Sequence, residues 1–378
     1  DGRFGSFSTN RLDKKELETL ITNGIESTRY LAVDESRMLA DPARYYKGGK
    51  PDLQLFDKKL YEVNPDDKVA IARAAAEEVL GKDERIISVD SSYSDGEGSS
   101  YRLISNGFEG ESKSTWFSVS ASVSIKGEGE ARPQDYWYDS ALFYDKLTKT
   151  GIGAKALERV LRKLGQKKAK SGKYTMVVDP MNVGNLLSPM LSALYGSALQ
   201  QKNSFLMDKL DTKVASDLFT LRDEPHAIGA NGSRYFDNEG VATEPRTVFD
   251  KGVLKTYFID TYNGKKMDIA PTISAPSRLI LTPGDKDLNG LVADIKQGIL
   301  VTGFNGGNSN SSTGDFSYGI EGFLIEDGKL TQPVNEMNVT GNMVTLWNSL
   351  VAVGNDPQPN RSWQIPSLVF EGVDFSGL

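Results

Sequence analysis

Apolar and polar residues alternate along the chain between residues 85 and 137, and this alternation limits the folds that the chain can adopt. In the clearest run, serines separate five apolar residues, which are Phe117, Val119, Ala121, Val123 and Ile125. Successive side chains of a β-strand point to opposite faces, so this run predicts a strand with one buried face and one polar face. Glycine and serine turns separate it from neighbouring runs, which indicates an antiparallel meander.

Helical patterns lie on both sides of this meander. A first helix is expected after Asp13, with Glu16 three residues on as a capping box. Its buried face is expected to hold Leu17, Leu20, Ile21 and Ile25. A second helix is expected after the cap and first-turn proline at Asn64 and Pro65, and a third spans about 153–164. Helices beside an antiparallel sheet are typical of an α+β fold.

The second half of the chain mixes strands, helices and hairpins. A short buried strand at 174–179 precedes a helix that is apolar on one side. Turns at 250–252 and 326–329 predict hairpins. Further helices are expected at 288–299 and 343–351. The fold class is therefore expected to be α+β, with mixed and antiparallel sheets flanked by helices.

Two domains are expected from the length of 378 residues. The N-terminal domain would cover 1–170 and the C-terminal domain 171–378, with the boundary in the polar stretch at 166–173. The chain begins at Asp1, without a methionine, in what resembles the end of a strand. We therefore expect that an N-terminal piece precedes it.

The charge of the chain limits its partners. A net charge of -7 argues against direct binding of nucleic acid, which needs clustered lysine and arginine. One basic segment at 155–173 is interpreted as the solvated face of a helix followed by a polar linker. The alternative is a patch that binds nucleic acid or an acidic partner. No apolar run approaches the roughly 20 residues of a membrane span. The expected location is the cytoplasm.

Histidine and cysteine are too scarce for a catalytic zinc site. His226 is the single histidine and cysteine is absent, whereas a catalytic zinc ion usually takes two histidines or a thiolate among its ligands. As a general base, His226 would need a nucleophile and an orienting carboxylate, and the sequence shows no such arrangement. A structural histidine in a loop is the preferred interpretation.

Two other segments could bind a ligand. Asp237 and Glu239 are two residues apart, so they could hold a hard cation such as Mg²⁺ or Ca²⁺; the alternative is a turn with Gly240 at positive φ. The segment Gly303–Asp315 is rich in glycine, asparagine and serine, and its backbone N–H groups could grip an anion or a peptide. The alternative for this second segment is a mobile loop.

Three blocks of the second half resemble the TldD/PmbA family, which is also named for modulation of DNA gyrase. The first block is 236–243 together with the hairpin at 246–254, the second is 314–334, and the third is 353–356. Their order and spacing match the family, and the first half is similar more loosely through 52–57. The resemblance implies the TldD/PmbA fold and places the family's first strands and helix before residue 1.

The resemblance also implies where a zinc ion would bind in relatives that hold one. TldD carries a His-Glu-x-x-x-His helix and a distant cysteine as zinc ligands, with the glutamate as general base. The His, Glu and His positions of this helix correspond to Leu187, Ser188 and Ser192 here. The cysteine is also missing, because the region 361–364 contains none. This pattern is similar to the PmbA/TldE branch. The resemblance therefore implies a TldD-like partner that holds the zinc, with this chain as the subunit without it.

A heterodimer of this kind cleaves unfolded peptides, and in isolation the chain could pair with a second copy. Residues that could contact the peptide or the partner are His226, Asp237, Glu239, Asn305, Asp315 and Tyr318. Two alternatives remain open. One is a non-enzymatic protein that binds DNA gyrase or another target. The other is a hydrolase that acts alone and uses Asp237, Glu239 and Asp315 with a divalent ion.

Overall fold

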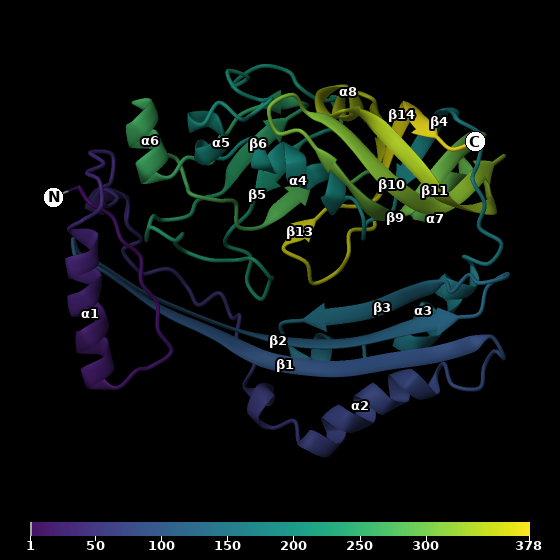
Figure 1. Ribbon diagram of the computed structural model, residues 1–378, viewed down its shortest axis with the longest axis horizontal. Helices are drawn as coiled ribbons and strands as arrows, with labels where there is room; N and C mark the ends of the chain where they lie inside the picture. The colour runs from purple at the N-terminus through teal and green to yellow at the C-terminus, as the bar shows by residue number, and fades with distance from the viewer. Residues whose placement is uncertain (1) are drawn as a thin grey trace.

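The alternating run near the middle of the first half forms a three-stranded antiparallel sheet, as predicted. Its strands are β1 (Ile86–Ile104), β2 (Phe108–Ile125) and β3 (Gln134–Ala141), in the order β1-β2-β3. The computed structural model describes residues 2–378. In Figure 1 this sheet forms the lower layer of the molecule and the second half of the chain forms the upper layer.

Two helices cover one face of this sheet. The apolar side chains of β2 pack in one cluster with α2 (Pro65–Glu77) and α3 (Ile152–Leu161). Because side chains alternate along a strand, the serines between them point to the other face. That face carries Ser118, Ser120 and Ser122 of β2, which are half-buried. The sheet therefore has one apolar face under helices and one polar face without them.

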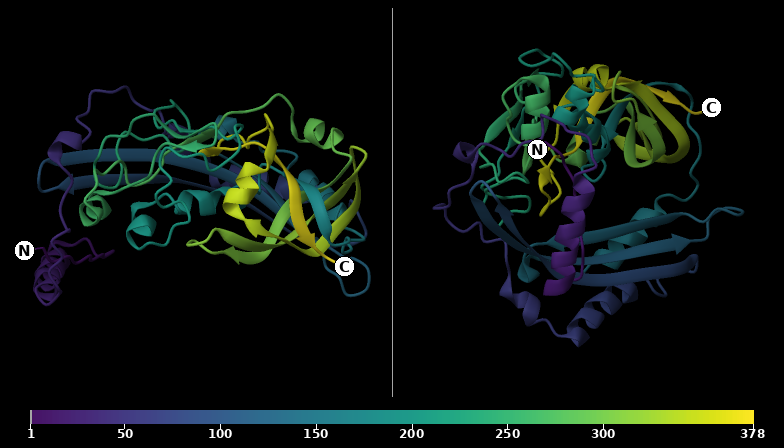
Figure 2. Two further views of the ribbon diagram at one scale, coloured as in Figure 1. Left: turned by 90° about the horizontal axis from the view of Figure 1, so that it is seen from above. Right: turned by 60° about the vertical axis from the view of Figure 1, so that its left-hand side comes forward.

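Helix α1 (Lys14–Thr28) begins where the sequence predicted, but its expected buried face is wrong. The Asp13 carboxylate accepts a hydrogen bond from the Glu16 backbone N–H at 3.0 Å, as a capping residue does. Ile21 and Ile25 are 60% and 54% exposed. The reason is that α1 stands at one end of the molecule (Figure 2), and none of its residues belongs to a buried hydrophobic cluster. Short 3₁₀ turns follow at Pro42–Arg44, Lys58–Tyr61 and Tyr144–Lys146.

The second half contains a sheet that closes into a small barrel. Its strand order is β11-β10-β9-β4-β14-β12, and an additional pairing of β11 with β14 joins the two sides. Within this sheet β4 and β9 pair in parallel, and the other neighbours pair antiparallel. The strands are β4 (Gly172–Val178), β9 (Gln297–Ser309), β10 (Asp315–Glu326), β11 (Lys329–Asn342), β12 (Leu350–Val353) and β14 (Leu368–Ser376).

A five-stranded sheet and several short helices complete this half. The sheet has the order β13-β8-β5-β6-β7, and its strands are β5 (Leu221–Asp223), β6 (Arg246–Asp250), β7 (Val253–Leu254), β8 (Leu279–Leu281) and β13 (Trp363–Gln364). The helices are α4 (Gly184–Ser192), α5 (Gly196–Gln200), α6 (Thr261–Met267), α7 (Leu288–Ala293) and α8 (Met343–Asn348). The helix predicted at 288–299 is too long, because the chain enters β9 at Gln297.

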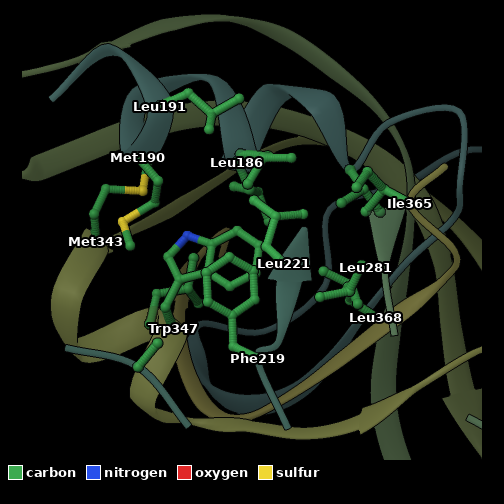
Figure 3. Close-up of a cluster of buried hydrophobic side chains, with 14 of the residues drawn as sticks. Leu186, Met190, Leu191, Phe219, Leu221, Leu281, Met343, Trp347, Ile365 and Leu368 are labelled. Atoms are coloured by element: carbon green, nitrogen blue, oxygen red, sulfur yellow. The ribbon is translucent and has the colours of Figure 1, made fainter. Parts of the chain in front are cut away.

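The largest core lies between these two sheets and α4. Trp347 of α8 is fully buried, and its ring centroid lies 4.4 Å from that of Phe219. Figure 3 shows Leu186 and Met190 of α4 on the same cluster. Among residues 2–378, no helix has both the length and the apolar character that a membrane crossing requires.

Most cations of the basic segment at 155–173 have carboxylate partners. Lys163 is buried between the two halves and contacts carboxylates of both. Lys155, Lys168 and Lys173 pair at the surface with Glu158, Glu336 and Asp374. The division proposed between residues 170 and 171 falls in the segment that joins α3 to β4.

Candidate functional site

The positions that hold zinc in the implied motif do not suit a metal ion in this chain. Leu187 on α4 is fully buried in the apolar core, and Ser188 and Ser192 are exposed on the other side of the helix. Pro189 lies inside the same helix. In the described part of the chain, residues 2–378, no three His, Cys, Asp or Glu side chains are grouped so that they could hold a metal ion. The donor set therefore does not fit the family's zinc ion.

His226 occupies a loop beside Tyr235. Its Nε2 lies 3.1 Å from the Thr243 hydroxyl, and its ring centroid lies 5.0 Å from that of Tyr235. Burial and then the nearby Lys50 ammonium lower the pKa of His226 below its usual value. The neutral ring is therefore favoured near pH 7. Its hydrogen-bond partner is a hydroxyl that donates to the Arg234 carbonyl, which suits a structural role in the loop.

Asp237 and Glu239 lie in a tight turn and point to different partners. Asp237 is 2% exposed, and its carboxylate accepts the backbone N–H groups of Glu239, Val241 and Ser274 at 2.9–3.0 Å. Glu239 instead accepts the N–H and hydroxyl of Thr261, both at 2.9 Å. Gly240 has φ +78°. The turn alternative from the sequence describes this segment, since the Asp237 oxygens are occupied by the backbone.

Burial raises the pKa of Glu239, and the Thr261 hydrogen bonds oppose that rise. Asp315 lies on the β9–β10 hairpin and accepts hydrogen bonds from Asn342 and Thr313, which hold the pKa of its carboxyl below the usual value. Asp237, Glu239 and Asp315 thus each have separate partners. This geometry gives no support to a hydrolase that would use the three with one divalent ion.

The expectation of a loop over Gly303–Asp315 is wrong for most of its length. Strand β9 continues to Ser309 and β10 starts at Asp315. The connection therefore consists of only the five residues 310–314. The Ser311 and Ser312 hydroxyls donate to the Asn203 side-chain oxygen at 2.7 and 2.6 Å. These bonds tie the hairpin tip to the segment that follows α5.

The six residues proposed to contact peptide or partner fall into two groups. His226, Asp237 and Glu239 belong to neighbouring loops beside the five-stranded sheet. Asn305, Asp315 and Tyr318 lie on the β9–β10 hairpin, where the Tyr318 ring stacks on Phe316 at a centroid distance of 5.4 Å. Asn305 donates to the Asn335 side chain at 3.4 Å.

A hollow beside the first group was not anticipated from the sequence. It has a volume of about 400 Å³ and lies between the far end of the β1–β2 hairpin and the loop at 233–238. Its aromatic wall includes Tyr46 and Tyr235, whose rings stack with centroids 5.1 Å apart. Arg102 and Arg234 also line it. These residues come from four distant segments, so no local pattern could have indicated the hollow.

A second hollow of about 350 Å³ adjoins the first. Both are lined by Leu55, Ser233 and Arg234. On the side of the three-stranded sheet, the second hollow meets Ser114 of β2, and on the other side it meets the loops at 231–234 and 276–277. The two hollows follow the seam between the β1–β2 hairpin and the second half of the chain.

Comparisons with known proteins match almost the whole chain. A model of the PmbA/TldA metallopeptidase central domain matches residues 58–164, and a model of the C-terminal domain of the same family matches residues 171–377. The metalloprotease PmbA homolog of Haemophilus influenzae is 28% identical over 99% of this chain and 83% of its own length. Metalloprotease PmbA of Escherichia coli O157:H7 is 27% identical over the same shares.

Solved structures agree with this match. A crystal structure from Bacteroides thetaiotaomicron, described as a candidate modulator of DNA gyrase, is 74% identical, has a TM-score of 0.99 and covers 100% of this chain and 86% of its own. The structure of TldE from Thermococcus kodakarensis is 21% identical with a TM-score of 0.82, over 98% of this chain and 86% of its own. The second likeness concerns the fold alone.

Proposed function

Because the chain belongs to the PmbA/TldD metallopeptidase family, we propose that it is the subunit of a metalloprotease complex that does not hold the catalytic metal. A TldD-like partner supplies the zinc ion, and the complex cleaves unfolded peptides. This chain contributes an interface and part of the chamber in which the peptide lies.

The proposal rests on helix α4, which occupies the place of the zinc-motif helix in the resemblance. The motif helix is present, yet its first ligand position is Leu187, fully buried in the core. Zinc bound by such a motif lowers the pKa of its water ligand and so generates the hydrolytic nucleophile. A chain with one histidine and no cysteine lacks the donors for that chemistry, so within this family its contribution is structural or substrate-binding.

The polar face of the three-stranded sheet supports a role in lining a chamber. Its serines point away from α2 and α3, and it exposes the aromatic rings of Trp116 (43% exposed) and Tyr136 (50% exposed). Serine hydroxyls can donate to and accept from a polypeptide backbone whatever its side chains are. Such a wall suits unfolded peptides of varied sequence.

The test is reconstitution. The chain and a TldD-like subunit are purified separately, and cleavage of an unfolded peptide is followed with each alone and with both mixed. We expect cleavage by the mixture, loss of cleavage when zinc is chelated, and co-elution of the two chains on size exclusion. A mixture that neither associates nor gains activity over the TldD-like subunit would contradict the proposal.

A second candidate is non-enzymatic binding to DNA gyrase. The observation that favours it is the description of the 74% identical relative as a candidate gyrase modulator. Capture of purified gyrase by this chain, with no peptidase subunit present, would support this candidate over the first.

A further inference from the structure

The hollow of about 400 Å³ is lined by Arg102, whose guanidinium group has no hydrogen-bond or ion-pair partner among residues 2–378. Arg102 is half-buried on β1 and lies opposite Gly110 of β2. Residues opposite each other in an antiparallel pair share a face, and a side chain at Gly110 would meet the ring of Phe236 from the second half. Arg102 therefore faces the second half of the chain, across the hollow.

Two other charged residues of the β1–β2 hairpin, Glu111 and Lys113, also line the hollow. Glu111 and Lys113 alternate with Gly110 and Ser112 along β2, so they belong to the opposite face. Lys113 accordingly lies 3.9 Å from the ring of Phe56 and pairs with Glu97 at 3.4 Å. Of these three charged residues, Arg102 is thus the one on the face of the hairpin that is turned toward the second half of the chain.

Arg102 lacks a counter-charge. Lys50, which also lines the hollow, pairs with Glu244 at 3.2 Å, whereas no carboxylate within residues 2–378 lies within ion-pair distance of Arg102. Arg234 on the other wall binds only neutral acceptors: its Nε donates to the Ser277 hydroxyl at 2.8 Å and its Nη2 to the Ala275 carbonyl at 2.8 Å. Two guanidinium groups thus line one hollow without a direct carboxylate partner.

We propose that this hollow binds the C-terminal carboxylate of a polypeptide, with the terminal side chain against the aromatic wall. A guanidinium group binds a carboxylate through two parallel hydrogen bonds, and Arg102 is free to do so. The stacked rings of Tyr46 and Tyr235 offer an apolar surface beside it. This proposal rests on the proposed function, which supplies the peptide. It adds which part of the substrate this chain recognises.

The charges around the hollow favour a carboxylate over a phosphate group. Asp52, Glu111 and Asp237 also line it, and the Asp237 oxygens accept hydrogen bonds from backbone N–H groups. Nearby carboxylates repel a phosphate dianion more strongly than a carboxylate monoanion. The exposed Asp52 instead suits contact with a peptide N–H group.

The proposal is tested by direct binding to the full chain, without a partner subunit. Fluorescence anisotropy is measured with three labelled peptides: one with a phenylalanine and a free C-terminal carboxylate, the same peptide as its C-terminal amide, and an amidated peptide with an internal glutamate. The Arg102→Gln variant is compared with Arg73→Gln, a matched control because Arg73 is exposed on α2, on the far side of the sheet. Circular dichroism checks that both variants fold.

We expect the free acid to bind about tenfold more tightly than the amide, as a charge-assisted pair predicts. This preference should fall below about twofold in Arg102→Gln and persist in Arg73→Gln. Equal binding of acid and amide, a preference that survives Arg102→Gln, or equally tight binding of the internal glutamate peptide would each overturn the proposal. Competition by adenosine monophosphate but not by the acid peptide would assign the hollow to nucleotides instead. None of these outcomes bears on whether the complex cleaves peptides, which the reconstitution measures separately.

Discussion

Lys163 joins the two halves of the molecule through Glu321, with the Nζ and Oε1 atoms 2.7 Å apart. Lys163 follows α3, and Glu321 belongs to β10 of the barrel. The same ammonium lies 3.2 Å from a carboxylate oxygen of Asp135 on β3. Only 10% of the Lys163 side chain is exposed, so this cation is held between two carboxylates at the seam.

Replacing this cation should destabilise the protein strongly. In Lys163→Met, Glu321 loses its counter-ion and Asp135 keeps only Arg159, at 3.2 Å, and the free energy of unfolding should fall by about 3 kcal/mol. Urea denaturation measures the change. The control is Lys168→Met, whose pair with Glu336 at 3.7 Å is exposed and should contribute under about 1 kcal/mol. Equal effects of the two substitutions would contradict this account of the seam.

Asp179 should make stability depend on pH. Burial raises its pKa to about 6 from 3.8, while hydrogen bonds from Asn182 and the charge of Arg159 oppose the rise. The folded protein then binds this proton more tightly than the unfolded chain does. The resulting stabilisation is complete below the unfolded pKa and is lost as the pH rises through about 6.

The Asp179→Asn variant removes this dependence. The stability of the variant minus that of the parent should be ~3 kcal/mol larger well above pH 6 than near pH 3, because each pKa unit corresponds to about 1.4 kcal/mol. Urea denaturation at the two pH values measures the difference. A parent and variant whose stabilities change in parallel with pH would show that Asp179 does not titrate in this way.

Asp237 should act on stability through its backbone partners. Asp237→Ala removes the acceptor of three buried N–H groups, so the free energy of unfolding should fall by about 3 kcal/mol or more. Asp52→Ala is the control, because Asp52 is exposed and accepts a single N–H, that of Gln54 at 2.9 Å. Thermal unfolding of both variants measures the contrast. A fully stable Asp237→Ala variant would instead point to a ligand-binding role for this carboxylate.

Leu187 should behave as a core residue although it occupies a zinc-ligand position of the implied motif. Leu187→Ala leaves a cavity, and the free energy of unfolding should fall by about 2–5 kcal/mol. Ser188→Ala on the exposed side of α4 should change it by less than about 0.5 kcal/mol. Chemical denaturation compares the two. A small effect at Leu187 would mean that α4 is poorly packed and could still accept a ligand.

The sequence predicted the elements that have a clear period or a clear terminus. The alternation around Phe117 identified β2, and Asp13 and Asn64 marked the starts of α1 and α2. The hairpin turns at 250–252 and 326–329 were also found, because an aspartate or glycine there adopts positive φ.

Features that depend on distant segments could not be predicted. The β9–β10 hairpin has a composition typical of loops, and its strand conformation comes from pairing with neighbours in the barrel. The start of β9 at Gln297 was assigned to a helix, since a short apolar run fits either structure. Closure of the barrel by β11 and β14 joins residues such as Val339 and Phe375 without a local signal.

The sequence and the structure contribute different parts of the candidate site. The assignment of Leu187, Ser188 and Ser192 to the positions of the zinc motif follows from residue types and the resemblance alone. The hollow near Arg102 depends on the β1–β2 hairpin meeting the loop at 233–238, so it required the structure.

Zinc content and peptide cleavage by the purified chain, measured with and without a TldD-like subunit, test the central claim most directly. We predict that after dialysis the isolated chain retains no stoichiometric zinc and leaves an unfolded peptide intact, whereas the mixture cleaves it in a zinc-dependent way. An isolated chain that keeps a tightly bound zinc ion and cleaves the peptide, with activity abolished by a chelator, would contradict the account.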